Sequence, residues 1–288
     1  MSAIERYAAP QTLDEALEIL RAGNVTILAG GTDLMPQTQS GKVSFQAALM
    51  NVRRIEALRG IEAADGSIRI GALTTITELL ESPLVQQHLP VLVEAADHFA
   101  SDQLRNAATI GGNICNASPA GDFLPPLLVL DAEVELVSKP NASMKTRSIP
   151  LAEFFVGPGR TKRAPGELLA AVRIPAPKAG FVAMFFKFGT RPALDISVIS
   201  IALGGIKAFE SLSGVRVAFG AVAPVPMRAP RTEAAIEGAR LDAAGIAAAA
   251  KAAQDEVNPI SDLRASTWYR KEMIRNVMRR MLTDAVQS

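Results

Sequence analysis

The stretch ATIGGNICNASPAGDFLPPLLVLDAEVEL, residues Ala108–Leu136, contains the most specific pattern in the chain. It opens on Thr109–Asn113, a glycine pair between polar residues, which we interpret as a loop. Pro125 and Pro126 then begin a short apolar helix, because proline is tolerated in a first helical turn. The apolar residues of Val134–Ser138 predict a strand. The stretch therefore indicates a fold that mixes helices with strands.

A second glycine pair lies upstream in LAGGTDLMP, residues Leu28–Pro36, directly after the β-branched run Val25–Leu28. Glycines leave room for an anion and permit positive φ, so that successive backbone N–H groups can converge on a phosphate. Two such loops can clasp the two phosphates of a dinucleotide, although a plain tight turn is the commoner meaning of either one. The sequence contains neither G-x-G-x-x-G nor G-x-x-x-x-G-K-[ST], so it supports neither a Rossmann nor a P-loop phosphate site.

The remaining patterns divide the chain into two parts. Thr12 and Thr75 each begin a T-x-x-E capping box that predicts a short helix. Further helices are predicted over 84–108 with breaks at Pro90 and near Ser101, and strands at 50–52 and 67–70. A segment rich in proline, glycine and basic residues at 157–180 indicates a domain boundary. Beyond it, strands at 181–188, 196–207 and 215–222 precede helices at 243–257 and 266–285, which is typical of an α+β domain.

Composition excludes several classes of protein. The 288 residues carry 30 Lys and Arg against 29 Asp and Glu, and the net charge of +1 indicates no nucleic-acid partner. One cysteine and two histidines exclude a disulfide, an iron–sulfur cluster or a thiolate zinc site built from this chain alone. No apolar run approaches the roughly 20 residues that a membrane span needs, and the first residues lack a signal peptide, so we expect a cytoplasmic protein without a membrane span.

The two glycine motifs together, with the N-A-S-P-A-G-D tail of the second, resemble the FAD-binding medium subunit of molybdenum hydroxylases. This is the flavoprotein family of xanthine dehydrogenase and carbon monoxide dehydrogenase, and the resemblance covers essentially the whole chain. It implies an α+β fold. Residues 1–174 would form a two-part FAD-binding domain of the vanillyl-alcohol-oxidase/MurB type, with subdomains at about 1–55 and 56–174. Residues 175–288 would form a flavoprotein C-terminal domain with an antiparallel sheet and helices.

The same resemblance implies which residues hold FAD. The two loops would bind the pyrophosphate and ribose, Asp122 would lie near the adenosine side, and Leu169 and Lys187 would flank the flavin ring. The cofactor-binding residues implied are Ile27, Leu28, Ala29, Gly30, Gly31, Thr32, Asp33, Leu34, Phe99, Thr109, Ile110, Gly111, Gly112, Asn113, Asp122, Leu169 and Lys187. No catalytic residue and no metal ligand are expected in this chain.

The resemblance further implies an oxidoreductase subunit that does not oxidise the substrate alone. A large partner would carry molybdenum–pterin and oxidise an N-heterocycle, an aldehyde or a similar substrate, and a small partner would carry two [2Fe–2S] clusters. Electrons would pass from molybdenum through the clusters to FAD and on to an external acceptor, in a dimer of heterotrimers. Two alternatives remain, a self-sufficient FAD oxidase or reductase of the same fold and a flavin-free scaffold.

Several of these residues also have simpler interpretations. Asp122 can cap the helix that follows it, Lys187 can be a solvated charge on an edge strand, and Phe99 and Leu169 can be core residues. Cys115 is expected to be a small buried residue. The basic residues of the last helix are expected to form a solvated or subunit-facing surface, comprising Arg264, Arg270, Lys271, Arg275, Arg279 and Arg280.

Overall fold

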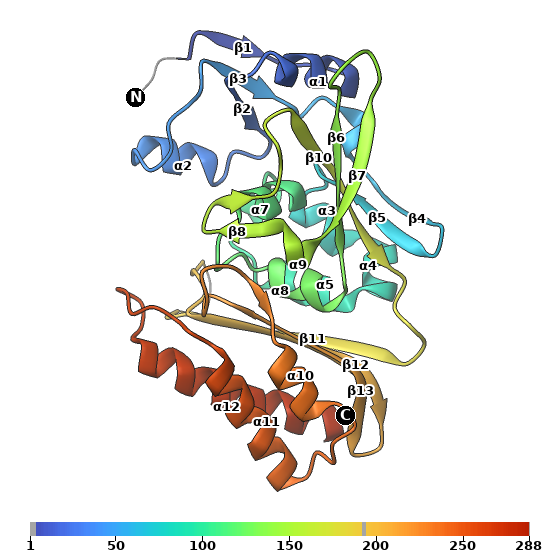
Figure 1. Cartoon of the computed structure of the whole chain (residues 1–288), viewed down its shortest axis with the longest axis vertical. Coiled ribbons are helices and arrows are strands. Elements are labelled where there is room, and N and C mark those ends of the chain that lie inside the picture. The colour runs from blue at the N-terminus through green and yellow to red at the C-terminus, as the bar shows by residue number, and fades with distance from the viewer. Residues whose placement is uncertain (1–3, 192–193, 288) are drawn as a thin grey trace.

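The chain forms an elongated molecule with three main sheets along its length (Figure 1). The computed structural model describes residues 4–191 and 194–287. At one end lies a parallel sheet of order β1-β3-β2, formed by β1 (Arg6–Ala8), β2 (Val25–Leu28) and β3 (Ala48–Asn51). Helix α1 (Leu13–Arg21) packs its apolar side into the core beneath this sheet. Thr12 caps α1 as predicted, by accepting a hydrogen bond from the N–H of Glu15 at 3.2 Å.

The middle of the molecule is an antiparallel sheet of order β4-β5-β10-β6-β7. Its strands are β4 (Ile61–Ala64), β5 (Ser67–Gly71), β6 (Glu133–Ser138), β7 (Lys145–Pro150) and β10 (Glu167–Pro175). The central strand β10 falls within the segment 157–180 that the sequence indicated only as a boundary. Most of β10 is buried on both faces, so it shows no alternation of apolar and polar residues. A two-stranded ribbon of β8 (Phe155–Gly157) and β9 (Arg160–Thr161) follows the short helix at Leu151–Phe154.

The remaining helices of this half of the chain are short. They are α2 (Leu34–Gln39), α3 (Ile76–Glu81), α4 (Pro83–His88), α5 (Pro90–Asp97), α6 (Asp102–Arg105), α7 (Ile110–Asn116), α8 (Leu124–Val129) and α9 (Leu151–Phe154), with a 3₁₀ turn at Glu56–Leu58. The predicted breaks near Pro90 and Ser101 are confirmed, and Thr75 forms its full capping box with Glu78. The interpretation of Thr109–Asn113 as a loop is wrong, because Thr109 caps α7 and the residues after it are helical.

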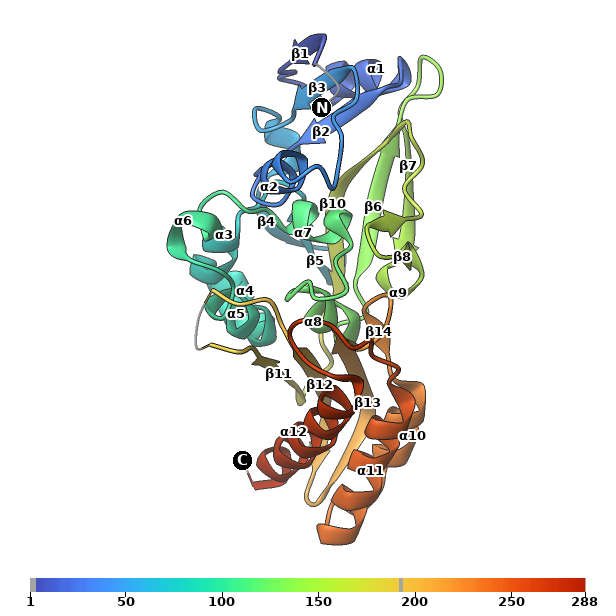
Figure 2. The same cartoon turned by 90° about the vertical axis from the view of Figure 1, so that its left-hand side faces the viewer.

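The C-terminal part is an antiparallel sheet between two helical layers (Figures 1 and 2). Its strand order is β11-β12-β13-β14, with β11 (Phe181–Phe188), β12 (Ile199–Ala208), β13 (Ser211–Gly220) and β14 (Met227–Arg228). Helices α5 and α8 lie against one face. The other face carries α10 (Pro230–Ile236), α11 (Ala243–Glu256) and α12 (Thr267–Gln287), which enclose a separate apolar core. Within the described residues, no helix has the length and apolar character required to cross a bilayer.

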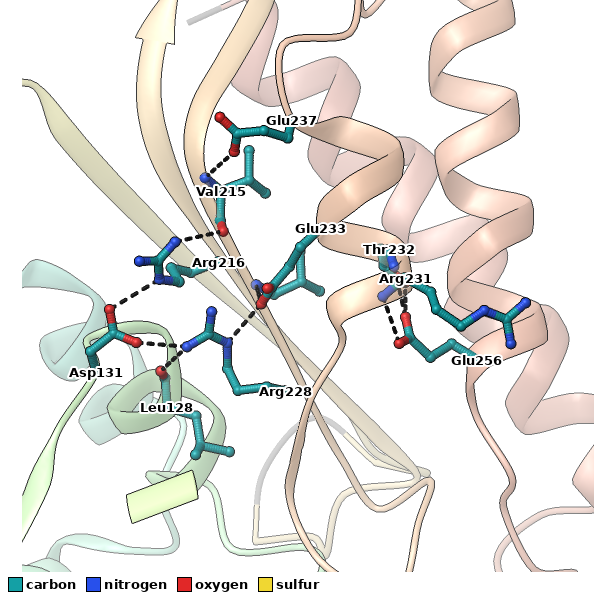
Figure 3. A network of polar contacts seen from close by, with 11 residues as sticks. Leu128, Asp131, Val215, Arg216, Arg228, Arg231, Thr232, Glu233, Glu237 and Glu256 are labelled. Atoms are coloured by element: carbon teal, nitrogen blue, oxygen red, sulfur yellow. Dashed lines mark hydrogen bonds and ion pairs between the residues drawn. The ribbon is translucent and has the colours of Figure 1, made fainter. Parts of the chain in front are cut away.

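A cluster of charged residues connects this sheet with α8, and Figure 3 shows it from close by. We call it the Asp131 cluster, and it comprises Asp131, Arg216, Arg228 and Glu233. Asp131 follows α8 and accepts hydrogen bonds from Arg216 Nε at 3.0 Å and from Arg228 Nη1 at 2.6 Å. Arg228 also donates to the carbonyl oxygen of Leu128 at 3.3 Å and to Glu233 at 2.7 Å. The two parts of the chain are therefore joined by polar contacts as well as by apolar packing.

Candidate functional site

The first glycine loop leaves its backbone donors free. Among the described residues, the N–H groups of Gly30, Gly31, Thr32 and Asp33 donate no hydrogen bond. Gly31 has a φ of +77°, a conformation that glycine adopts without strain. The loop therefore presents several unsatisfied donors at the carboxyl end of β2, as the sequence predicts for an anion-binding turn.

Close packing brings the two glycine motifs together. A Cβ atom on Gly30 would lie 2.1 Å from the carbonyl oxygen of Ala107, so only glycine allows the first loop to approach the residues before α7 this closely. Gln37 of α2 adds a bridge, because its Nε2 donates to Asn116 Oδ1 of α7 at 3.0 Å. The structure thus makes one continuous surface from segments that are far apart in the sequence.

The second motif differs from the first in its use of backbone donors. The N–H groups of Ile110 and Gly111 donate to the carbonyl oxygens of Thr74 and Ala72, both at 3.0 Å, and Gly112 donates to Thr109 Oγ1 at 3.1 Å. Its glycines therefore do not offer free N–H groups, in contrast to our expectation for this loop. Gly111 instead permits the contact with Ala72, whose Cβ would lie 2.7 Å from an added Cβ.

Asn113 is the polar group of α7 that the chain leaves unsatisfied. It is 9% exposed, and its Oδ1 is buried without a hydrogen-bond partner among the described residues. Buried polar atoms almost always have a partner, and an orphan in a folded protein points to a missing ligand or water. Asn113 lies in α7, which Gln37 connects to α2, and the segment before α7 packs against Gly30 through Ala107, so the unsatisfied oxygen and the free N–H groups belong to elements that contact each other.

A buried ion pair lies beyond α7. Lys187 Nζ is 2.7 Å from Asp122 Oδ2 and donates to the carbonyl oxygen of His98 at 3.1 Å, while Ser197 Oγ donates to Asp122 Oδ1 at 2.8 Å. The Lys187 side chain is 9% exposed, so the interpretation of this lysine as a solvated edge charge is wrong. Asp122 does not cap α8, because its carboxylate is committed to Lys187 and Ser197. Burial raises the pKa of Asp122, and the contacts with Lys187 and Ser197 oppose that increase.

The other predicted residues fall into apolar surroundings. Phe99 is half-buried and its ring centroid is 5.6 Å from that of Phe123, which follows Asp122. Leu169 is 3% exposed in β10, in the same core cluster as Ile110. The remaining members lie in β2 or in the loop and helix after it, namely Ile27, Leu28, Ala29 and Leu34. Cys115 packs against the same core, and burial raises the pKa of its thiol.

Lys187 also lines an open cavity of about 900 Å³ that the sequence did not reveal. His98, Arg191, Arg264 and Trp268 contribute to its wall. The cavity forms where the end of β11 meets the start of α12. These two segments are far apart in the sequence and share no motif, so the sequence did not predict it. The N-A-S-P-A-G-D string was the signal that located Asp122, whereas no comparable signal marks Ser197 or Arg264.

Two family models match the chain. The model described as FAD binding domain in molybdopterin dehydrogenase covers residues 2–177, and the model described as CO dehydrogenase flavoprotein C-terminal domain covers residues 184–285. The chain therefore belongs to the family of FAD-binding subunits of molybdopterin dehydrogenases. This confirms the expected α+β fold of an FAD-binding domain followed by a C-terminal domain with an antiparallel sheet.

Individual relatives agree with this family. The putative xanthine dehydrogenase FAD-binding subunit of Escherichia coli strain K12 is 35% identical over 283 residues, which cover 97% of this chain and 95% of the relative. The carbon monoxide dehydrogenase medium chain of Hydrogenophaga pseudoflava is 32% identical, over 97% of this chain and 96% of the relative. A solved structure of carbon monoxide dehydrogenase from H. pseudoflava that lacks the Mo-pyranopterin moiety of the cofactor superimposes with a TM-score of 0.92. Its identity is 31%, over 99% of this chain and 98% of the other.

The residues present fit a dinucleotide such as FAD. The free N–H groups of Gly30–Asp33 suit the negative oxygens of a pyrophosphate, and Asn113 Oδ1 can accept a hydrogen bond from a ribose hydroxyl. The close contact between Gly30 and Ala107 holds these donors against the segment before α7. The site therefore contains donors and an acceptor of the kind that such a ligand requires.

Proposed function

We propose that this chain binds one FAD noncovalently and acts as the electron-transfer subunit of a molybdenum hydroxylase. When bound, FAD supplies a redox carrier that receives electrons from the centres of the partner subunits and delivers them to an external acceptor. The observation that carries this proposal is the group of free N–H donors at Gly30–Asp33, held against the residues before α7. Thr109–Asn113 would support the ribose from the other side.

The Asp122–Lys187 pair would set the electrostatics beside the flavin ring. Lys187 is held at a fixed position by Asp122 and by the carbonyl oxygen of His98, so its positive charge costs no reorganisation when negative charge develops nearby. Ser197 and the surrounding burial keep water from Asp122. The cavity beside Lys187 would give the external acceptor access to this region. Phe99 and Leu169 would supply apolar contact with the ring.

We further propose that the chain works with partner chains. A large subunit with molybdenum–pterin would oxidise the substrate, and a small subunit would carry two [2Fe–2S] clusters, in a dimer of heterotrimers located in the cytoplasm. The FAD-binding domain would extend over residues 1–174 and the C-terminal domain over 175–288. This division of labour is supported by the relatives, since one of them is called a carbon monoxide dehydrogenase medium chain.

The test is the flavin content of the purified chain and of matched variants. We expect one FAD per chain, identified by absorption and by the mass of the nucleotide released on denaturation. Gly31→Asp should abolish FAD retention, because it places a carboxylate among the donors for phosphate. Gly31→Asn has nearly the same shape and tolerates positive φ, so it is the control that separates charge from size. Gly112→Asp should also prevent retention, because its Cβ would lie 2.9 Å from Thr109 Oγ1.

Normal flavin content in Gly31→Asp and Gly112→Asp would contradict the proposed binding site. Absence of FAD from the wild-type chain, even with excess FAD and with co-expressed large and small subunits, would contradict the electron-transfer function. A flavin-free scaffold would then be the better interpretation. Substrate oxidation by the isolated flavin-loaded chain would instead favour a self-sufficient oxidase or reductase.

A further inference from the structure

Arg270 is a buried cation at the start of α12. The sequence placed it on a solvated or subunit-facing basic surface, but it is 3% exposed. Its Nη1 donates to the carbonyl oxygens of Val198 at 2.6 Å and Ala221 at 2.8 Å, and its Nη2 donates to Asp262 Oδ1 at 2.7 Å. Nε is buried without a partner among the described residues. Three acceptors from three different segments thus meet at one planar group.

Two of these acceptors lie where the C-terminal sheet contacts the proposed flavin site. Val198 follows Ser197, whose hydroxyl donates to Asp122 at 2.8 Å. Ala221 donates its N–H to the carbonyl oxygen of Pro119 at 2.7 Å, and Pro119 belongs to the same loop as Asp122. Arg270 therefore holds two of the backbone segments that the C-terminal part sets against the Asp122 loop.

The third acceptor connects Arg270 with the wall of the cavity. Asp262 Oδ1 also accepts from the N–H groups of Arg264 at 2.9 Å and Ala265 at 3.2 Å, and both of these residues line the cavity. A guanidinium can hold several acceptors in fixed directions, which neither a lysine nor an apolar side chain can reproduce. A buried charge is costly, and an apolar residue would fill this space at a lower cost if packing were its whole purpose.

We infer that Arg270 is a positioning residue that fixes Ser197 against Asp122, and with it the Asp122–Lys187 pair beside the flavin. This inference rests on the proposed function, because it assumes that the pair lies beside bound FAD. Arg270 acts through the backbone of Val198 and Ala221, and no direct contact with the cofactor is required.

The test is a double-mutant cycle on FAD affinity in the full chain, measured together with the visible spectrum of bound FAD. Arg270→Met and Ser197→Ala should each weaken FAD binding by about tenfold, since each leaves buried polar groups without partners. If Arg270 acts through Ser197, the two substitutions should not act independently. The loss of FAD affinity in the double variant should then be much smaller than the product of the losses in the two single variants. The expected coupling is about threefold or more.

The matched control is Arg228→Met in a cycle with the same Ser197→Ala. Arg228 also joins the two parts of the chain, through Asp131 and Leu128 (Figure 3), but among the described residues no hydrogen bond or ion pair connects it with the Asp122 loop. Both arginine variants should lower the melting temperature, and only Arg270→Met should couple with Ser197→Ala and share its shift of the flavin absorption band. Multiplicative effects of Arg270→Met and Ser197→Ala would overturn the inference.

Three further variants keep the test decisive. If Arg270→Met does not fold, Arg270→Lys and Asp262→Asn enter the same cycle, because each retains part of the polar network. Lys187→Met tests the proposed function separately. If it changes neither FAD affinity nor the spectrum, the pair does not lie beside the flavin and the proposed site is wrong. If it changes both while the Arg270 cycle shows no coupling, only the present inference fails.

Discussion

Glu167 shows how one side chain can hold a strand and a turn together. Arg147 makes two parallel contacts with it, Nε to Oε1 at 2.5 Å and Nη2 to Oε2 at 2.7 Å, and the N–H of Ala164 donates to Oε2 at 2.7 Å. The side chain is 10% exposed at the start of β10. The hydrogen bonds from Arg147 keep the pKa of Glu167 below its ordinary value, although burial opposes this.

This lowered pKa predicts the pH dependence of stability. The folded state binds fewer protons at Glu167 than the unfolded state, so its contribution is present above the unfolded pKa and is lost as pH falls through the folded pKa. Glu167→Gln should lower the free energy of unfolding at pH 7 by about 1 kcal/mol, because Arg147 is partly exposed. It should also flatten the fall in melting temperature from about pH 5 to about pH 3. An unchanged slope over this range would contradict the assignment.

Helix α7 is the element whose formation depends most on its surroundings. Two of its first four residues are glycines, which lower helix propensity by about 1 kcal/mol each relative to alanine. The carbonyl oxygens of Thr74 and Ala72 compensate by accepting hydrogen bonds from Ile110 and Gly111, and Thr109 caps the end. The helix is thus specified by tertiary contacts as much as by its own sequence.

The cap of α7 should contribute to both stability and cofactor retention. Thr109→Ala removes the acceptor for the N–H of Gly112, and we expect a loss of about 1 kcal/mol in the free energy of unfolding. FAD should also bind more weakly, because Asn113, the proposed acceptor for the ribose, is the residue next to Gly112 in the same helical turn. Thr109→Ser keeps the hydroxyl and should restore most of both properties. Denaturant unfolding of the flavin-free chain and titration with FAD would measure them, and equal behaviour of the two variants would argue against a role for the cap.

The success of sequence reasoning differed among elements for physical reasons. Capping boxes and apolar periodicity are local, and they predicted α1, α3 and the strand β11 well. Strand β10 was missed because a central buried strand lacks alternation, and α7 because its glycines favour a loop. Within the site, the resemblance named both Asp122 and Lys187 but not their ion pair, because Lys187 lies on β11, far along the chain, and Ser197, in the segment before β12, carried no signal. Arg270 was misjudged because two of its three acceptors are backbone carbonyls, which no sequence pattern displays.

Two groups of charged residues join the FAD-binding part of the chain to the C-terminal part, and they differ in how far they are exposed to solvent. The Asp131 cluster is at the surface, since the Asp131 side chain is 49% exposed. The Asp122–Lys187 pair is buried, with side chains 10% and 9% exposed. Exposed pairs contribute little to stability, whereas removal of one partner from a buried pair leaves an uncompensated charge. The two contacts should therefore respond very differently to mutation.

At the scale of the whole molecule, we predict that Lys187→Met destabilises the chain at pH 7 by about 3 kcal/mol or more. Asp131→Asn, its counterpart at the surface, should cost about 1 kcal/mol or less. Without Lys187, burial raises the pKa of Asp122 further, so the variant binds more protons folded than unfolded and gains stability as pH falls. Thermal unfolding at about pH 7 and about pH 5 would test this. A stability difference from wild type that widens on acidification would contradict it.

The central place of β10 has a consequence for how the chain is synthesised. Its neighbours β5 and β6 end at residues 71 and 138, while β10 itself spans residues 167–175. The five-stranded sheet cannot close until residue 175 has left the ribosome, because β10 pairs with both neighbours at once. Until then the nascent chain exposes two unpaired strand edges, the kind of surface that promotes association between chains. Ribosome pausing before residue 175 would prolong that exposure, so the rate of translation through this segment should influence the yield of folded protein.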